Sequence, residues 1–293
     1  MLRQTDIMGV THDKVQRAID RLRAFEPPEG YYVAFSGGKD SQCIYHLCKQ
    51  AGVKFDAHYN VTSVDPPELV RFIRDQYPNV SRDIPHDKDG KPVTMWNLIV
   101  KKGMPPTRLT RYCCQELKET KGAGRLVVTG VRWAESVNRA KRQGIVNTLN
   151  GLTFNNDNAE TRRHVEQCYR TRKTLINPIV DWSTADVWEY LNDVAKVPHC
   201  SLYDEGFERL GCIGCPLAGS KKARREFERW PAYYTNYLRA FARMVERKPV
   251  SKREKYTSAQ AVMDWWLCEK SNEKPLEGQI SMWEGDEDAN PDD

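Results

Sequence analysis

The order of apolar and polar residues predicts alternating strands and helices in the first part of the chain. Residues 31–35 and 55–61 are short runs rich in apolar and aromatic side chains, which is typical of buried parallel strands. Apolar residues at helical spacing precede the first run over residues 11–25 and follow it over residues 43–51. Strand, helix and strand in this order predict a parallel sheet.

The later chain adds short strands and then becomes helical. Residues 126–129 and 175–180 predict two more strands, whereas residues 147–158 are rich in Asn and Gly and predict a mobile insertion or lid. We therefore expect an α/β domain over residues 31–216, with a twisted parallel sheet and helices on both faces. The other predicted parts are an N-terminal helix in residues 1–30, a helical extension over residues 217–282 and an acidic disordered tail over residues 283–293.

The turn between the first predicted strand and its helix has the composition of a phosphate site. It reads Ser36-Gly37-Gly38-Lys39-Asp40-Ser41. A strand-to-helix turn aims backbone N–H groups and a helix dipole at one point, and glycines let an anion approach the backbone. Lys39 adds a positive charge, and Asp40 is expected to cap the helix or to help hold Mg²⁺ on the phosphates. An ordinary glycine-rich turn is the alternative.

The string lacks the spacing of a P-loop. It resembles the pyrophosphate loop (PP-loop) of the N-type ATP pyrophosphatases. That resemblance implies an adenine nucleotide alpha hydrolase-like fold, in which residues 36–41 hold the β- and γ-phosphates of ATP with Mg²⁺. An acceptor then attacks the α-phosphate, which gives an adenylated acceptor and pyrophosphate.

A second basic segment is expected beside this loop. Residues 130–139 follow a predicted strand, and the carboxyl ends of parallel strands share one edge of the sheet. Arg132, Arg139 and Arg142 would place guanidinium groups near the phosphates, with a solvated basic helix face as the alternative. The predicted catalytic residues are Lys39, Asp40 and Arg132, and the predicted nucleotide-binding residues are Ser36, Gly37, Gly38, Lys39, Asp40, Ser41, Gly130 and Arg139.

Four of the nine cysteines form two pairs with metal-ligand spacing. Cys113 and Cys114 are adjacent, and Cys212 and Cys215 are separated by two residues, so that a tight turn lets both reach one metal. Four thiolates are a full ligand set for a [4Fe-4S] cluster or for a structural zinc, and spacing does not separate the two. A zinc site in which Cys200 and His199 join Cys212 and Cys215 is the main rival to the cluster.

A second resemblance favours the iron-sulfur alternative. The arrangement Cys113-Cys114 with Cys212-x-x-Cys215 is similar to the cluster ligands of the assimilatory adenylyl-sulfate reductases. These enzymes and the phosphoadenylyl-sulfate (PAPS) reductases belong to the same superfamily as the ATP pyrophosphatases. The resemblance covers residues 31–216, and it implies that the four cysteines hold a [4Fe-4S] cluster.

Two departures from the reductases change the expected activity. The reductases carry an altered phosphate loop and a nucleophilic cysteine in a C-terminal Glu-Cys-Gly motif, whereas this chain has the intact ATP-cleaving string and lacks that motif. Both departures favour the ATP-activating branch, which in related proteins inserts sulfur into tRNA or into the DNA backbone. That branch implies a tRNA or DNA acceptor, and a cysteine desulfurase or another sulfur donor as a partner.

The remaining cysteines are expected to have structural roles. Cys43 and Cys48 fall on the apolar face of the helix after the loop and are predicted core residues. Cys268, in an apparent helix, is also predicted to be packed. Cys168 lies in a basic stretch, where it is either an exposed structural residue or a thiol that carries a persulfide.

Composition and charge limit the partners. The chain has 293 residues, of which 40% are hydrophobic and 29% charged, as in globular proteins. The net charge is +5, but the last ten residues carry six acidic side chains, so the rest carries +11, which suits an anionic second substrate. Residues 1–23 lack an apolar segment, so neither a signal peptide nor a membrane span is expected. Nine cysteines then indicate the reducing cytoplasm.

These observations predict an ATP pyrophosphatase of the PAPS reductase family that adenylates an acceptor for sulfur transfer, with a nucleic acid as the expected acceptor. One alternative is a PAPS or adenylyl-sulfate reductase whose thiol comes from elsewhere. The other is a zinc-stabilised nucleic-acid-binding module without catalysis, since the basic helix after Ser220 either grips a polynucleotide or packs on the sheet.

Overall fold

A computed structural model describes the chain except for residues 6–10, 120, 149–150, 172, 248–256 and 269–293. The chain divides into two compact units, the first holding Met1–Pro92 and Cys114–Gly211, the second Val93–Cys113 and Cys212–Asp293. The predicted boundaries after residues 30, 216 and 282 stay predictions. The predicted acidic tail lies outside the described residues.

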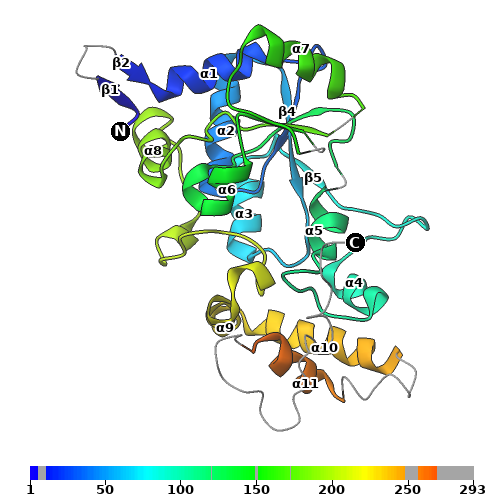
Figure 1. The fold of residues 1–293 in the computed structure, drawn as a ribbon. Helices are drawn as coiled ribbons and strands as arrows, with labels where there is room; N and C mark the ends of the chain where they lie inside the picture. Colours follow the sequence, from blue (N-terminus) through cyan, green and yellow to red (C-terminus); the bar gives the residue numbers. More distant parts are fainter. Residues whose placement is uncertain (6–10, 120, 149–150, 172, 248–256, 269–293) are drawn as a thin grey trace, which may run out of the picture. The chain divides into compact units, whose positions relative to one another are not determined.

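A mostly parallel seven-stranded sheet forms the centre of the first unit, as predicted, and helices flank it (Figure 1). The strand order is β5-β4-β3-β6-β9-β7-β8. The strands from β5 to β9 in this order are parallel, and β7 and β8 join antiparallel at one edge. The strands are β3 (Tyr31–Ala34), β4 (Phe55–Asn60), β5 (Ser81–Asp83), β6 (Leu126–Val128), β7 (Val146–Thr148), β8 (Thr153–Phe154) and β9 (Thr174–Ile176).

Strand β3 lies at the point where the strand order reverses. Its Tyr31 and Val33 are fully buried, and Tyr32 is also buried, because β3 is covered on both faces. It pairs with β4 on one side and with β6 on the other, so the loops that follow β3 and β6 leave the same edge of the sheet beside each other. In parallel α/β sheets, ligands bind at this reversal, outside the carboxyl ends of the strands.

Helices α1 and α2 pack against each other, and α2 also packs against α8. The first predicted helix begins three residues late, because Asp13 caps it by accepting a hydrogen bond from the Gln16 backbone N–H at 3.0 Å. The preceding Thr11–Asp13 forms β2 and pairs with β1 (Arg3–Thr5). The helices are α1 (Lys14–Ala24), α2 (Lys39–Ala51), α3 (Pro67–Gln76), α6 (Val137–Arg142), α7 (Ala159–Cys168) and α8 (Thr184–Glu189).

The segment predicted as a mobile insertion or lid, residues 147–158, contains regular structure that its composition did not indicate, and its mobility stays a prediction. The chain forms β7 and β8, which extend the sheet. Asn147 is buried, and its side chain accepts from the Gly144 backbone N–H at 3.0 Å and donates to the Thr153 hydroxyl at 3.0 Å. The polar composition that indicated a loop therefore supplies hydrogen bonds inside the hairpin.

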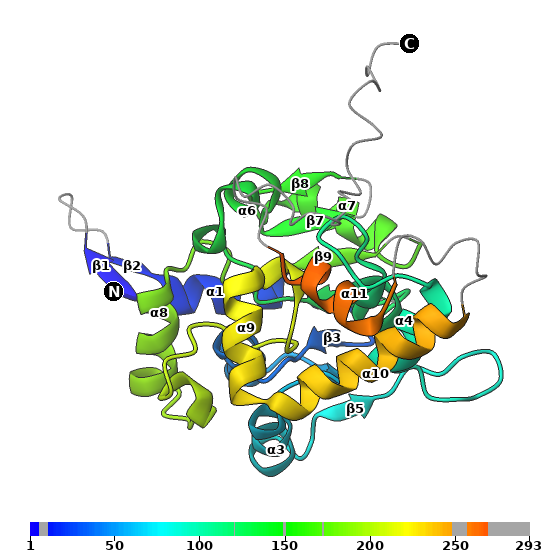
Figure 2. The ribbon, with the colours of Figure 1, turned by 90° about the horizontal axis from the view of Figure 1, so that it is seen from below.

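The second unit is helical, which confirms the predicted C-terminal helices (Figure 2). Helix α10 packs against α4, α9 and α11, and its Tyr237 and Phe241 are buried. The Trp266 indole N–H donates to the Pro106 carbonyl at 2.7 Å within this unit. No described helix is long and apolar enough to cross a membrane. The helices are α4 (Met95–Lys102), α9 (Ser220–Arg229), α10 (Pro231–Arg247) and α11 (Ala259–Trp266); the short α5 (Tyr112–Cys114) lies at the boundary between the units.

Candidate nucleotide-binding site

The turn after β3 is shaped for glycine and leads into a helix whose N-cap residue is also a glycine. Gly37 has a φ of +72°, and a Cβ there would lie 2.7 Å from Ile73 and 2.8 Å from Leu69, both side chains of α3. Helix α2 begins at Lys39, with Gly38 at its N-cap and no side-chain cap. The packing of the turn against α3 therefore holds the N-terminus of a thirteen-residue helix in a position to receive an anion.

The two serines of the loop bind each other rather than capping the helix. The Ser41 hydroxyl donates to the Gly38 carbonyl at 2.8 Å and accepts from the Ser36 backbone N–H at 3.2 Å. Ser41 is buried, while Ser36 is exposed. Ser41 thus fixes the loop, and Ser36 is the hydroxyl that a ligand can reach.

Asp40 does not cap α2, contrary to one of its two predicted roles. Its Oδ1 accepts from Arg132 Nε at 2.7 Å, and Arg132, which is only 2% exposed, also donates to the Trp182 carbonyl at 3.2 Å. The other carboxylate oxygen lies 3.8 Å from the Lys39 Nζ. The buried Arg132 therefore orients the Asp40 carboxylate. The predicted role of Asp40 in holding Mg²⁺ stays a prediction.

Lys39 is buried with its charged end bonded to the chain. Its Nζ donates to the Glu208 carbonyl at 2.9 Å. Burial lowers the pKa of Lys39, Asp40 opposes that shift, and the nearby Arg132 and Arg209 add to it. A phosphate placed here would replace a neutral carbonyl partner with an anion, which favours the ammonium form.

Gly130 brings the loop after β6 against the start of α2. A Cβ at this position would lie 2.9 Å from both the carbonyl carbon and the oxygen of Asp40. The missing side chain lets the two loops approach at the strand reversal. The structure therefore brings together the two segments that were expected to share this edge of the sheet.

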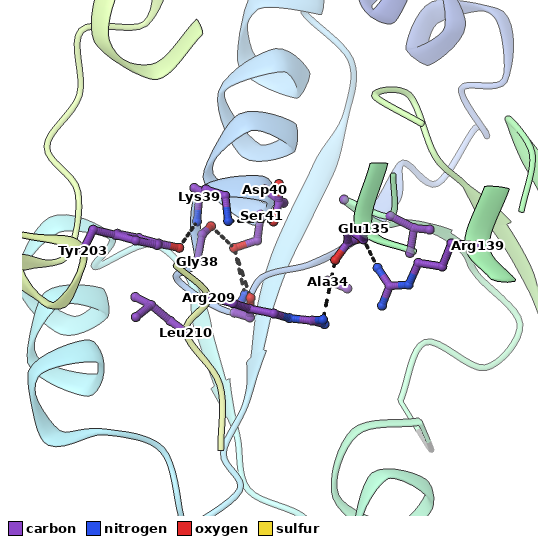
Figure 3. A pocket seen from close by; sticks show the side chains of 13 residues that line it. Ala34, Gly38, Lys39, Asp40, Ser41, Glu135, Arg139, Tyr203, Arg209 and Leu210 are labelled. Carbon is purple, nitrogen blue, oxygen red and sulfur yellow. Dashed lines mark hydrogen bonds and ion pairs between the residues drawn. The ribbon is translucent and has the colours of Figure 1, made fainter. Parts of the chain in front are cut away.

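A cavity of about 190 Å³ lies over the loop (Figure 3). Glu135 and Arg139 line it from the segment after β6, and Arg209 lines it from the segment before the end of the first unit. The Glu135 carboxylate pairs with Arg139, lies 3.8 Å from the Arg209 guanidinium and accepts from the Arg132 backbone N–H at 3.1 Å. One carboxylate thus lies close to two guanidinium groups that line the same cavity, and the three groups together carry one net positive charge.

Sequence reasoning missed Tyr203, Glu135 and Arg209. The Tyr203 hydroxyl accepts a hydrogen bond from the Lys39 backbone N–H at 2.8 Å, across 164 positions of sequence. Residues 198–210 have no helical or strand periodicity, so no local pattern indicated that they return to the loop. Arg209 carried one weak signal, its place just before the predicted metal-ligand turn.

The predicted metal ligands are divided between the units. Cys113, Cys212 and Cys215 belong to the second unit, where burial raises the pKa of the Tyr237 hydroxyl well above its usual value and the charges of these three cysteines add to that rise. Cys114 belongs to the first unit. In the part of the chain that the structure describes, no three cysteine, histidine, aspartate or glutamate side chains are placed to hold a metal ion.

The other cysteines mostly match expectation. Cys43 and Cys48 are fully buried in α2, as predicted. Cys200 is buried as well, and burial raises the pKa of its thiol. Cys268 is exposed, so the prediction that it is packed is wrong, because it follows the last turn of α11. Cys168 is half-buried on α7, with its Sγ 3.8 Å from His164 Nε2.

Comparison with known proteins identifies the family. Residues 30–218 match the phosphoadenosine phosphosulfate reductase domain. The match covers well over half of the chain, and the chain therefore belongs to this family. The family contains enzymes named as reductases of adenylyl sulfates, and the mostly parallel sheet described above is the fold of its matched region.

Individual relatives are distant. An uncharacterized protein of Methanocaldococcus jannaschii is 28% identical over 72% of this chain and 42% of its own length, so the chain spans less than half of that relative. The adenosine 5′-phosphosulfate reductase of Oceanobacillus iheyensis is 29% identical over 35% of this chain and 34% of its own length. A crystal structure of PAPS reductase from Candida auris is 17% identical, with a TM-score of 0.45 over 67% of this chain and 87% of that one.

Proposed function

We propose that the chain binds Mg²⁺-ATP at residues 36–41 and transfers the adenylyl group to an acceptor, which is thereby activated for sulfur transfer. The observation that carries this proposal is the buried Lys39 at the N-terminus of α2, where the N-cap residue Gly38 has no side chain, with Arg139 and Arg209 lining the same small cavity. A helix N-terminus with three cations is suited to a polyphosphate, which carries more charge than a single phosphate ester.

The residues of the site take defined roles in such a reaction. An acceptor oxygen forms a bond to the α-phosphorus, and the bond from that phosphorus to the bridging oxygen breaks and leaves pyrophosphate. Lys39 and the amides of α2 stabilise the negative charge that passes to the leaving group. Arg132 keeps the Asp40 carboxylate at the edge of the loop, where it is available to Mg²⁺.

Activation explains how sulfur would then enter the acceptor. The terminal sulfur of a persulfide donor forms a bond to the acceptor atom that carries the adenylated oxygen, and the bond from that atom to the oxygen breaks to release AMP. An external thiol then attacks the donor's sulfur in the resulting disulfide, so that the sulfur–sulfur bond breaks, the thiolated acceptor leaves, and the donor and the thiol are joined in a disulfide. We propose a nucleic-acid acceptor, because outside its last ten residues the chain carries a net charge of +11. A cysteine desulfurase or another persulfide-bearing protein is the proposed donor.

The thiolate set Cys113, Cys114, Cys212 and Cys215 suits a [4Fe-4S] cluster or a zinc ion in chemistry and number. Their described placement does not bring three of them to one metal ion. We therefore derive no step through a metal. A bound cluster remains a prediction, to be tested by counting iron, sulfide and zinc in anaerobically purified protein.

A reductase is the second candidate, because several relatives are named adenosine 5′-phosphosulfate reductase. Product analysis separates the two activities. The protein is incubated with Mg²⁺-ATP, total tRNA or genomic DNA and a persulfide donor, or with adenylyl sulfate and a thiol reductant. Acceptor-dependent pyrophosphate and AMP support the proposal, while sulfite from adenylyl sulfate without any pyrophosphate from ATP would overturn it.

A further inference from the structure

A second, larger cavity opens beside the phosphate loop in the first unit. It has a volume of about 670 Å³, against about 190 Å³ for the cavity over the loop. The two share a wall that includes Lys39, Tyr203 and Arg209. The size falls in the usual range for small-molecule sites, of about 300–1,000 Å³. A group bound in this cavity would therefore lie next to the phosphates of a nucleotide on the loop.

Aromatic side chains line part of this cavity. Trp188 of α8 and Phe207 contribute to it together with Tyr203. The Trp188 indole lies nearly perpendicular to the ring of Tyr203, at a centroid distance of 4.9 Å, and to that of His199, at 5.3 Å. These two contacts fix the orientation of the indole plane, and the half-buried Trp188 lines the cavity. A planar aromatic ligand can stack on such a ring.

The same cavity also has three basic and three acidic residues in its lining. Arg132 and Arg209 line it beside Lys39, and the Arg209 side chain is 66% exposed. Asp40, Glu135 and Glu208 are the acidic residues in the lining, and the first two already pair with arginines. An aromatic surface next to exposed guanidinium suits a nucleobase with its own phosphate group.

We propose that this cavity, named the Trp188 cavity, binds one nucleobase of the acceptor nucleic acid, with the base on Trp188 and the adjacent phosphate near Arg209. The inference rests on the proposed function, because it assigns the acceptor to a place beside the ATP phosphates. It also assigns the two substrates of one reaction to neighbouring cavities that share Lys39.

Binding measurements with and without nucleotide test this assignment. The probe is a fluorescein-labelled single-stranded RNA pentamer of mixed sequence, with its DNA counterpart, titrated by anisotropy onto protein saturated with a non-cleavable α,β-methylene ATP analogue. The variants are Trp188→Ala and the ring-retaining Trp188→Phe. Phe154→Ala serves as the control, because Phe154 is a half-buried aromatic residue on β8 that lines neither cavity. Circular dichroism checks that each variant folds.

Trp188→Ala should weaken probe binding about tenfold or more, as loss of one stacked base predicts, and leave the affinity for the ATP analogue within about twofold. Trp188→Phe should retain most of the affinity, and Phe154→Ala all of it. Absence of probe binding by the unaltered protein, or equal probe binding by Trp188→Ala, would overturn the assignment. A loss of ATP-analogue affinity in Trp188→Ala would also overturn it, because the cavity would then hold the adenosine of ATP.

Failure of the proposed function gives a different pattern. If the unaltered protein ignores the ATP analogue but binds adenylyl sulfate, the adenylation proposal fails. The titration without nucleotide then tests the Trp188 cavity by itself. Weaker probe binding by Trp188→Ala than by the unaltered protein still supports a nucleobase site there, and equal binding contradicts such a site.

Discussion

The phenolic hydroxyl of Tyr203 lies at the N-terminus of α2, where it accepts a hydrogen bond from the Lys39 backbone N–H at 2.8 Å. The Lys39 ammonium donates at the same time to the Glu208 carbonyl at 2.9 Å. Tyr203 and Glu208 therefore bond the backbone N–H and the ammonium group of Lys39, which are the two groups that a phosphate would contact. A ligand on the loop has to replace at least one of these bonds.

The first prediction concerns this competition. Tyr203→Phe removes the competing acceptor and leaves the ring in place, so ATP should bind more tightly. One neutral hydrogen bond is worth about 1 kcal/mol, which corresponds to about fivefold in Kd. Isothermal titration with Mg²⁺-ATP measures the change, and Tyr169→Phe, in a residue whose hydroxyl bonds Glu29, is the control. Weaker binding by Tyr203→Phe would mean that the hydroxyl assists the ligand.

The second prediction is a pH dependence of ATP affinity. Burial lowers the pKa of Lys39 from its ordinary value of 10.5, so the free protein loses this charge at a lower pH than an exposed lysine would. A bound phosphate needs the ammonium form, and affinity should therefore fall as pH rises through the pKa of Lys39 in the free protein. Titrations from about pH 7 to about pH 10 should show the fall.

Lys39→Arg provides the matched comparison, because a guanidinium stays charged over that whole range. Its ATP affinity should be weaker at neutral pH but nearly independent of pH. Lys39→Ala should lose about tenfold or more at neutral pH, through loss of a charged hydrogen bond. Parallel pH profiles for the native protein and Lys39→Arg would contradict the assignment of this titration to Lys39.

The third prediction tests the close approach of the two loops. Gly130→Ala places a Cβ 2.9 Å from the Asp40 backbone, so the loop after β6 must move. Overpacking of this kind costs about 1–3 kcal/mol in the free energy of unfolding. Both Tm and ATP affinity should fall. Gly211→Ala is the control, because a Cβ there meets open space; an equal effect of both substitutions would argue against the contact.

The fourth prediction concerns the buried Asp186 of α8. It accepts from Lys14 Nζ at 2.6 Å, and it forms a capping box with Ser183, whose backbone N–H donates to it at 2.8 Å. Burial acts to raise the pKa of Asp186, but the hydrogen bonds from Lys14 and Ser183 outweigh it, and the pKa is lowered. Asp186→Asn should cost about 2 kcal/mol in the free energy of unfolding at neutral pH, from the broken ion pair and cap.

The pH range of that effect follows from the direction of the shift. A carboxyl with a lowered folded-state pKa stabilises the protein fully above its unfolded value of 3.8, and this stabilisation disappears as pH falls through the folded-state pKa. The difference between native protein and Asp186→Asn should therefore shrink below about pH 4. Denaturant unfolding at several pH values measures it, with the exposed Asp193→Asn as a control that should change little.

Local sequence patterns predicted the strand, the phosphate loop and the helix of the site, because these three elements are adjacent in sequence. The apolar run before the loop, the two glycines and the helical spacing after them lie within about twenty residues, and each has a direct physical reading. The parallel sheet then placed Gly130 beside Asp40, since carboxyl ends of parallel strands share one edge. The hairpin of β7 and β8 was missed because its buried polar residue, Asn147, looks like a loop residue in sequence.

The long-range contacts that complete the site were not predictable from local patterns. The Tyr203 hydroxyl and the Glu208 carbonyl reach Lys39 from more than 160 positions away, through a segment whose regular structure is one short 3-10 helix at Ser201–Tyr203. The Arg132–Asp40 pair spans 92 positions, and only the fold decides that Arg132 orients Asp40 from a buried position. Long-range contacts from irregular segments leave no periodic signal.

The most direct test of the central claim is competitive binding of Mg²⁺-ATP, adenylyl sulfate and its 3′-phosphorylated form to the unaltered protein, with Lys39→Ala as the control. The account predicts that ATP binds most tightly, that Mg²⁺ strengthens its binding, and that Lys39→Ala loses this preference. Tighter binding of either sulfonucleotide than of ATP would contradict the account and identify the protein as a reductase-type enzyme.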